Sequence, residues 1–323
     1  MNEIVMKNQL IELKSHIQQT IVGQEKLIDR LLVALLSEGH ILIESVPGLA
    51  KTTAVRTLAS GIDTDFQRIQ FTPDLIPGDI TGTDIFVPQR GDFQFMPGPI
   101  FNDIILADEI NRAPPKVQSA LLEAMQEHQV TVGGNSRALS EVFIVIATQN
   151  PLEHEGTYPL PEAQLDRFFM KTHLDYPSTE EELKILHLEQ QRLTNQQDKQ
   201  NISPLNKGAI LQARQEVNNI YMDEMLERYI LALVHATRDP SPWLPELTDS
   251  LSYGASPRAS LALARAARAT AYLHERDFVE PGDIMEIAHD VLNHRISLNF
   301  HARAEGLNNQ TFIERIVENV PVP

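Results

Sequence analysis

Cysteine is absent from the 323 residues, which excludes disulfide bonds and thiolate metal sites. Aromatic residues make up only 6% of the chain, so the core has to be built mainly from aliphatic side chains. No run of about 18 apolar residues occurs, so we expect no membrane span. The first residues lack a basic segment followed by an apolar one, so we expect no secretory signal and a cytoplasmic location.

Basic residues are outnumbered, because 27 Lys and Arg stand against 44 Asp and Glu, giving a formal net charge of −17. A chain this acidic is repelled by the phosphates of nucleic acids and by anionic membranes. Arg258, Arg265 and Arg268 form the only local basic cluster in the sequence, and it is small. The 11 histidines lack the paired spacing of a zinc site. We therefore expect neither a nucleic-acid partner nor zinc.

Short apolar runs alternate with helical patterns in the first half of the chain. Strands are expected at 41–43, 66–71, 102–107, 142–147 and 169–174, with helices at 7–20, 25–38, 51–60 and 115–127. This alternation is typical of a parallel sheet covered by helices on both faces. Two predicted hairpins, near 83–97 and 129–139, interrupt it and should project from the sheet, either as functional inserts or as loops without a function.

The strand pattern stops after residue 176. A helix is expected from about residue 180, and the Gln- and Asn-rich run 194–203 indicates a linker. Further helices are expected at about 205–219, 223–238, 257–275, 281–297 and 309–318. We therefore expect an α/β domain over residues 1–176, which contains both hairpins, and an all-α domain over residues 177–323.

A candidate phosphate-binding loop lies between the first expected strand and the helix that follows it. It consists of Ser45, Val46, Pro47, Gly48, Leu49, Ala50, Lys51, Thr52 and Thr53. Backbone N–H groups and the positive end of a helix attract phosphate oxygens. Lys51 would reach the outer phosphates, and Thr52 would place its hydroxyl on Mg²⁺. The usual pattern has Gly at positions 45 and 50, so the loop alone also fits an ordinary strand–turn–helix.

Two adjacent carboxylates, Asp108 and Glu109, follow the apolar run at 104–107. Ligands bind at the carboxyl ends of parallel strands. Asp108 would therefore hold Mg²⁺, and Glu109 would orient and activate the water that attacks a phosphate. The alternative is a strand that runs into a solvated acidic loop. The phosphate loop about 60 residues upstream favours the catalytic interpretation.

Three further polar residues are candidates for contacts with phosphate or water. Asn150 follows the strand expected at 142–147, although an Asn before a Pro is also a common turn residue. Arg167 would be an arginine finger supplied to a neighbouring subunit, or else would pair with Asp166. Arg258 follows the expected N-cap Ser256, where its charge opposes the helix dipole unless a phosphate lies nearby.

Six stretches occur in a characteristic order: IVGQ (21–24), SVPGLAKT (45–52), FTPDLIPGDITGT (71–83), DEINRAPPKVQSALLEAMQE (108–127), ATQNPLEHEGTYPLPEAQLDRF (147–168) and GASPRA (254–259). With these stretches the chain resembles the MoxR family of AAA+ ATPases, in the helix-2-insert branch. The resemblance covers nearly the whole chain.

The resemblance implies an AAA+ P-loop NTPase core with a parallel sheet between helices, an all-α lid, and a ring, usually a hexamer, with ATP and Mg²⁺ between subunits. It implies that Val22 and Gly23 join residues 45–53 in binding nucleotide, and that the hairpins are the helix-2 insert and the pre-sensor-1 hairpin. The implied roles are Walker A for Lys51 and Thr52, Walker B for Asp108 and Glu109, sensor 1 for Asn150, arginine finger for Arg167 and sensor 2 for Arg258. Family members are thought to act as chaperone-like remodellers of partners that carry von Willebrand factor A domains.

Three functions follow as hypotheses. The first is a Mg-ATP-hydrolysing remodeller or maturation factor for partner proteins. The second is a nucleotide-binding regulatory scaffold with little hydrolysis, which Ser45 would favour if its position required a positive φ. The third is a nucleic-acid motor, since related insert-bearing ATPases act on DNA, and the acidic composition argues against it.

Overall fold

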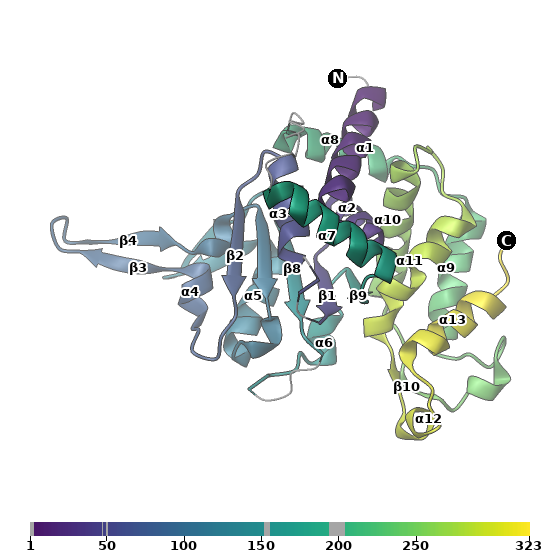
Figure 1. The fold of residues 1–323 in the computed structure, drawn as a ribbon. Helices are drawn as coiled ribbons and strands as arrows, with labels where there is room; N and C mark the ends of the chain where they lie inside the picture. The colour runs from purple at the N-terminus through teal and green to yellow at the C-terminus, as the bar shows by residue number, and fades with distance from the viewer. Residues whose placement is uncertain (1–2, 47, 50, 152–155, 194–203) are drawn as a thin grey trace. The chain divides into compact units, whose positions relative to one another are not determined.

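The computed structural model describes residues 3–46, 48–49, 51–151, 156–193 and 204–323 (Figure 1). The chain packs as two compact units. The first unit contains residues 1–160 and 172–212, and the second contains residues 161–171 and 213–323. This division differs from a boundary at residue 177, because the helix after that residue packs with the first unit and the segment 161–171 with the second. The expected linker at 194–203 lies outside the described residues.

A five-stranded sheet in the order β2-β5-β8-β1-β9 forms the centre of the α/β part. Its strands are β1 (Ile41–Ser45), β2 (Phe66–Gln70), β5 (Ile104–Asp108), β8 (Ile144–Gln149) and β9 (Met170–Leu174). The pairs β1–β8, β5–β8 and β2–β5 run parallel. The central strands are buried because their apolar runs are covered on both faces, as a parallel sheet requires. The predicted parallel sheet between helices is confirmed.

Helices of the first unit flank this sheet (Figure 1). They are α1 (Glu3–Thr20), α2 (Glu25–Leu36), α3 (Lys51–Gly61), α4 (Pro77–Thr81) and α5 (Pro115–Glu127). The unit also contains α7 (Thr179–Leu193), and α8 (Lys207–Asn218) contains the boundary between the two units in the sequence. Helix α2 is buried along most of its length, which its leucine-rich sequence explains. In the part of the chain that the structure describes, no helix is long and apolar enough to cross a membrane.

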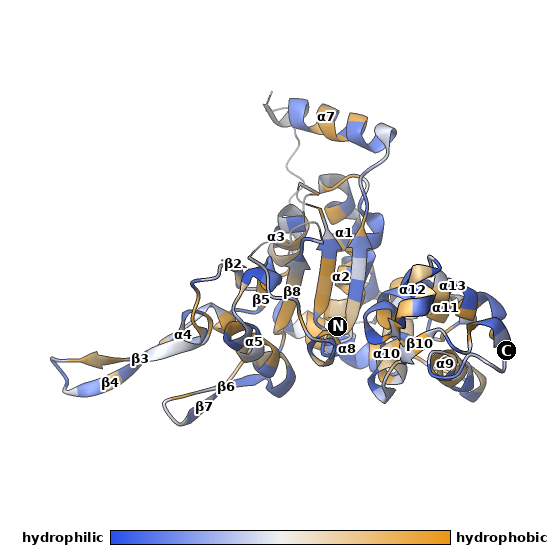
Figure 2. Ribbon diagram, turned by 90° about the horizontal axis from the view of Figure 1, so that it is seen from below, coloured by the Kyte–Doolittle hydropathy of each residue, from blue (hydrophilic) through white to orange (hydrophobic). Residues whose placement is uncertain are grey.

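Two antiparallel hairpins extend away from the sheet (Figure 2). One consists of β3 (Gly82–Val87) and β4 (Asp92–Pro97), the other of β6 (Gln129–Val132) and β7 (Asn135–Ala138). Arg137 joins them, because its guanidinium lies 3.8 Å from the centre of the Phe95 ring and pairs with Asp84. At the far end, Phe86 and Phe93 pack edge to face yet remain 52% and 66% exposed. The hairpins are therefore braced at the base and apolar at one tip.

The second unit is mainly helical. Its elements are α6 (Glu162–Leu165), α9 (Glu224–Ala236), η3 (Pro245–Leu247), α10 (Pro257–Leu273), α11 (Pro281–Leu292), η4 (Asn293–Arg295), α12 (Phe300–Ala304) and α13 (Asn309–Asn319). The alanines of α10 are buried and allow it to pack closely on α11. A helical lid is confirmed, with the addition of a small antiparallel sheet of β10 (Leu251–Tyr253) and β11 (Ser297–Leu298).

The helix expected over 281–297 is too long, since α11 ends at Leu292. Residues 293–295 form a 3-10 turn, and Ile296 is extended at φ −123° and ψ 152°, which leads the chain into β11. His294 and Arg295 in that turn hydrogen-bond to the carbonyl of Phe168. These tertiary bonds override a helical pattern that continues in the sequence.

Candidate nucleotide-binding site

The two adjacent carboxylates lie at the carboxyl end of β5, where the sequence predicts them. Thr148, fully buried on the neighbouring strand β8, donates its hydroxyl to Asp108 Oδ1 at 2.5 Å. The same hydroxyl oxygen accepts the backbone N–H of Glu109 at 2.9 Å. Glu109 has a left-handed backbone, with φ 58°, which is unusual for a residue other than Gly. Thr148 therefore fixes both acidic residues, and the sequence analysis did not single it out.

Side chains from β2 bind the other oxygens of the pair. Arg68 donates to Asp108 Oδ2 from Nε at 3.1 Å and from Nη2 at 2.6 Å. Gln70 donates to Glu109 Oε2 at 2.8 Å, and Arg112 lies 3.0 Å from the same oxygen. Arg68 and Gln70 share one face of the strand because they are two residues apart. In the sequence, only the polar residues on one face of the strand FQRIQ could have pointed to Arg68 and Gln70. The sheet order is what places this edge strand beside β5.

Lys51 links the phosphate loop to these carboxylates. It begins α3, and burial lowers the pKa of its ammonium group, while the charges of Asp108 and Glu109 raise it. The charges of both carboxylates therefore act on Lys51, as expected if the phosphate loop and the end of β5 belong to one site. The role of Lys51 in binding phosphate stays a prediction.

The backbone at Ser45 shows whether this residue strains the phosphate loop. Ser45 is buried at the end of β1, its hydroxyl donates to the Val46 carbonyl at 3.1 Å, and its φ lies outside the left-handed region. The strain considered for a Ser at this position is therefore not present. Gly48 does need to be Gly, because its φ is +90°. Pro47 and Ala50, both predicted to contact nucleotide, lie outside the described residues.

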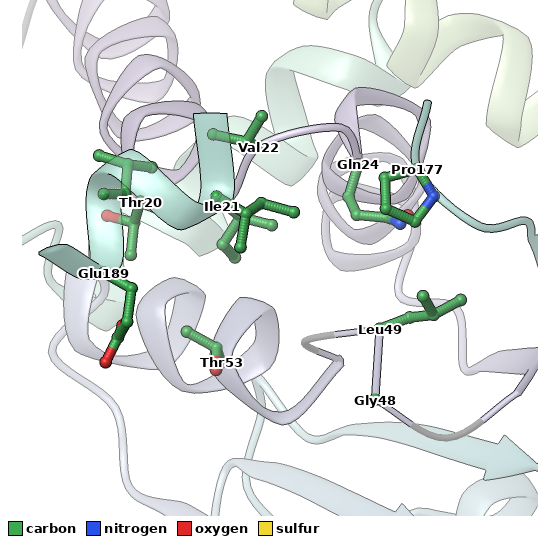
Figure 3. Close-up of a pocket in the computed structure, with 11 residues that line it drawn as sticks. Thr20, Ile21, Val22, Gln24, Gly48, Leu49, Thr53, Pro177 and Glu189 are labelled. Atoms are coloured by element: carbon green, nitrogen blue, oxygen red, sulfur yellow. The ribbon is translucent and has the colours of Figure 1, made fainter. Parts of the chain in front are cut away.

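A pocket of about 150 Å³ in the first unit opens beside the loop (Figure 3). Four predicted nucleotide contacts line it, namely Val22, Gly48, Leu49 and Thr53. The other lining residues are Thr20, Ile21, Gln24, Pro177, Ile185, Leu188 and Glu189. A largely apolar wall with a few polar groups suits a planar, partly apolar ligand such as a nucleotide base.

Gly23 lies between the pocket and the start of α7. Its φ is +76°, and a Cβ there would lie 2.9 Å from Cδ of Glu181. Glu181 is held in place by Ser178, since the Ser178 N–H donates to Glu181 Oε2 at 2.7 Å. Gly23 thus accommodates the positive φ of the turn between α1 and α2 and leaves room for Glu181 at the start of α7, while its predicted contact with nucleotide stays a prediction.

The donor groups fit Mg²⁺. Asp108 and Thr52 offer a carboxylate and a hydroxyl, and Mg²⁺ prefers oxygen ligands, with one or two from the protein and the rest from water and phosphates. Within the described ranges, no group of three or more His, Cys, Asp or Glu forms a metal cage. An ion at this site would therefore depend on nucleotide phosphates for much of its coordination.

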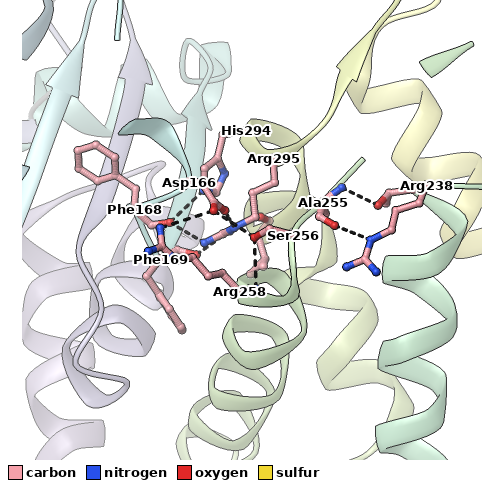
Figure 4. A network of polar contacts seen from close by, with 11 residues as sticks. Asp166, Phe168, Phe169, Arg238, Ala255, Ser256, Arg258, His294 and Arg295 are labelled. Carbon is pink, nitrogen blue, oxygen red and sulfur yellow. Dashed lines mark hydrogen bonds and ion pairs between the residues drawn. The ribbon is translucent and has the colours of Figure 1, made fainter. Parts of the chain in front are cut away.

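The candidate arginines Arg167 and Arg258 both belong to the second unit. Figure 4 shows the surroundings of Arg258. Asp166 accepts from Ser256 Oγ at 3.1 Å, lies 3.7 Å from Arg258 Nη1, and accepts from Arg295 Nε at 3.0 Å. Ser256 caps α10, as predicted. Arg258 therefore has a carboxylate beside it, where the sequence analysis suggested a phosphate. Arg167 is exposed, and Asn150 is buried just after β8.

Comparison with known proteins gives the family. Residues 40–170 match the ATPase family associated with various cellular activities (AAA), and residues 247–316 match the AAA lid domain. The chain is 46% identical over 308 residues to Chaperone MoxR1 of Mycobacterium tuberculosis, covering 95% of this chain and 80% of that protein.

The chain belongs to the MoxR family of AAA+ ATPases. Protein MoxR of Methylorubrum extorquens is 30% identical to it, with 95% of this chain and 93% of that protein covered. The crystal structure of a candidate ATPase from Cytophaga hutchinsonii superposes with a TM-score of 0.91 at 47% identity, covering 99% and 97% of the two chains. The predicted family and fold are confirmed, while the roles of single residues stay predictions.

Proposed function

We propose that this MoxR-family chain hydrolyses ATP with Mg²⁺ in a homo-oligomeric ring, a hexamer, and uses the cycle to remodel or mature a partner protein. The observation that carries the proposal is that Lys51, at the start of α3, lies within the electrostatic reach of Asp108 and Glu109 at the carboxyl end of β5. Phosphate-binding and water-activating groups are thereby combined in one unit, beside a pocket that fits a base.

Each predicted residue then has a role. Lys51 and the N–H groups at the start of α3 bind the outer phosphates, and Asp108 and Thr52 hold Mg²⁺. The ion, when bound with ATP, neutralises phosphate charge. Glu109 orients the attacking water and accepts its proton, and Asn150 provides an amide for that water or for the γ-phosphate. Arg258 and Arg167 keep their predicted roles in stabilising phosphate charge, with Arg167 acting from a neighbouring subunit.

One of the two carboxylate oxygens of Glu109 is engaged by neighbouring side chains. Its Oε2 atom accepts from Gln70 and lies beside Arg112, so this oxygen is occupied by hydrogen bonds with side chains. Both partners have side chains near the surface, so releasing them costs about 1 kcal/mol or less each. Binding of nucleotide and Mg²⁺ is expected to provide that difference.

The regulatory scaffold is the weaker candidate. Ser45 was its support, and the unstrained backbone at Ser45 removes the reason to expect poor nucleotide binding.

A protein partner is favoured by the exposed aromatic pair Phe86 and Phe93 at the tip of the β3–β4 hairpin. Exposed apolar side chains on a projecting element typically mark contacts with other proteins. By family resemblance, the partner is expected to carry a von Willebrand factor A domain.

The test is steady-state ATP hydrolysis measured against protein concentration with Mg²⁺. We expect the specific activity of the natural chain to rise with concentration, because Arg167 acts on a neighbour's nucleotide. Arg167→Ala is expected to lower kcat roughly 10³-fold or more. Glu109→Gln is expected to bind ATP with similar Kd and to lose turnover, because its amide cannot accept the proton.

A suitable control is Arg228→Ala, since Arg228 is an exposed arginine of α9 whose partner is Glu224. This variant should keep the activity of the natural chain. Flat, negligible hydrolysis at every concentration, with nucleotide still bound, would contradict the proposal and favour the scaffold. Full activity in Glu109→Gln would overturn the assignment of the base.

A further inference from the structure

Arg295 places a buried guanidinium against the segment that carries Arg167. The Arg295 side chain is only 3% exposed. Its Nε donates to Asp166 Oδ1 at 3.0 Å, Nη2 donates to the Phe168 carbonyl at 2.7 Å, and Nη1 donates to the Phe169 carbonyl at 3.2 Å (Figure 4). A further bond goes to the Val291 carbonyl. All of these groups belong to the second unit.

Burying this charge is unfavourable unless its donors are satisfied. Burial lowers the pKa of Arg295 to about 10, even though the charge of Asp166 and its hydrogen bond raise it. The planar fork of an arginine matches a carboxylate and two carbonyls, a set that a lysine cannot reproduce. The arrangement is thus specific to Arg and aimed at residues 166–169.

Arg167 lies in the middle of the stretch that Arg295 holds. The side chain before it, Asp166, and the carbonyl after it, that of Phe168, are both bound. Phe168 and Phe169 are buried, and His294 also binds the Phe168 carbonyl at 3.0 Å. The backbone on both sides of Arg167 is therefore fixed, while the Arg167 side chain stays exposed.

The same carboxylate reaches the second candidate arginine. Asp166 Oδ1 accepts from Arg295, whereas Asp166 Oδ2 accepts from Ser256 and lies beside Arg258. Fixing Asp166 thereby sets the surroundings of Arg258 as well as the turn of Arg167.

We propose that Arg295 is a positioning residue for ATP hydrolysis, whose buried fork sets Arg167 and Arg258 in one fixed arrangement. The proposal rests on the proposed function, because Arg167 matters here only as a group that acts on ATP. Arg295 touches neither substrate nor reacting atoms. Its effect passes through the backbone of residues 166–169 and through the Asp166 carboxylate.

A purely structural role is the alternative, and Arg276 provides a matched control. Arg276 also belongs to the second unit and binds the buried Asp283 carboxylate through two nitrogens, with a further bond to the Phe278 carbonyl. Its partners lie in and before α11 rather than in the segment 161–171. Replacing either arginine should lower stability, but only one replacement should displace Arg167.

The experiment compares Arg295→Lys with Arg276→Lys in the full chain. We measure Tm, the Kd for ATP, kcat at ring-forming concentration, and amide hydrogen exchange. Arg295→Lys is expected to lower kcat roughly 10- to 100-fold, since displacing a catalytic group by about 1 Å can lower the rate by up to about 100-fold. Its Kd for ATP should change less than about twofold, because the contacts that bind ATP in the ground state are not altered. Arg276→Lys should keep its kcat.

Hydrogen exchange gives a reading that does not depend on hydrolysis. The N–H groups of Arg167 and Phe168 donate to the Gln164 and Leu165 carbonyls, so they are protected in the fold. They should exchange faster in Arg295→Lys and at the natural rate in Arg276→Lys. If Arg295→Lys does not fold, Asp166→Asn serves as the second variant, with the same kcat and exchange results expected.

The outcomes separate the two proposals. If the natural chain hydrolyses ATP and Arg167→Ala does not, then normal kcat in Arg295→Lys overturns the positioning role alone. Equal losses of kcat in Arg295→Lys and Arg276→Lys, in step with Tm, also overturn it and indicate general destabilisation. No hydrolysis by the natural chain at any concentration overturns both.

Discussion

Arg68 neutralises the carboxylate that is predicted to hold Mg²⁺. Its guanidinium lies 2.6 Å from Asp108 Oδ2, and its side chain is 45% exposed. Such a pair contributes about 1 kcal/mol or less, so the cation site should be weakened but not blocked. The residue was not recognised in the sequence because Arg68 and Asp108 are 40 positions apart.

We therefore expect Arg68→Gln to lower the Mg²⁺ concentration needed for half-maximal ATP hydrolysis by roughly two- to fivefold, the range that such a pair allows. Removing a positive charge beside a cation site favours the cation. The measurement is a Mg²⁺ titration at saturating ATP, with Arg90→Gln in the β3–β4 turn as the control. An unchanged or higher half-saturation concentration would show that Arg68 does not compete with the ion.

Helical turns and strand ends were mostly predictable because their signals are local. The strand predicted at 41–43, which the structure extends to Ser45, the position of Asp108 and Glu109, and the hairpin turns follow from apolar runs and Gly positions within a few residues. The end of α11 could not be predicted in this way, because the 3-10 turn η4 is stabilised by hydrogen bonds to the distant segment 166–169. An element end is unpredictable when partners far along the chain decide it.

The same turn makes stability depend on pH. His294 is buried. Burial, followed by the charge of Arg295, lowers its pKa well below 6.5, while the Phe168 carbonyl opposes this shift and Lys171 adds to it. The folded state therefore keeps His294 neutral, whereas the unfolded chain binds a proton below about pH 6.5. This stability is present above pH 6.5 and is lost as pH falls below it, by up to about 1.4 kcal/mol per pH unit.

We expect His294→Gln to remove that loss, because a Gln amide can still donate to the Phe168 carbonyl and does not titrate. The measurement is the free energy of unfolding in urea for both chains at about pH 7.5, 6.0 and 5.0. The natural chain should lose more stability on acidification than the variant. Parallel curves for the two would mean that His294 is not the titrating group.

At the scale of the whole molecule, charge decides between classes of partner. The net charge is −17, and the small basic cluster seen in the sequence is engaged within the fold. Arg265 lies 5.5 Å from the centre of the Phe169 ring, and Arg268 donates to the Ile220 carbonyl at 3.2 Å. Both guanidinium groups thus contact other residues of the second unit, which makes them less available to bind the phosphates of a nucleic acid.

We expect no binding of double-stranded DNA by the natural chain at about 50 mM salt and up to about 10 μM protein, conditions that favour phosphate contacts. The measurement is fluorescence anisotropy of a labelled duplex, with and without ATP and Mg²⁺. A rise in anisotropy that added salt reverses would contradict the prediction and return the nucleic-acid motor to consideration.

The sequence by itself determined the family, the order of the main elements and the candidate groups of the phosphate loop and of β5, because each of these signals lies in short contiguous stretches. The tertiary structure decided which side chains surround them. Thr148, Arg68 and Gln70 meet the carboxylates only because the sheet order places β2 and β8 on either side of β5. Arg295 and Asp166 are 129 positions apart, so only folding could bring that charge to the segment it holds.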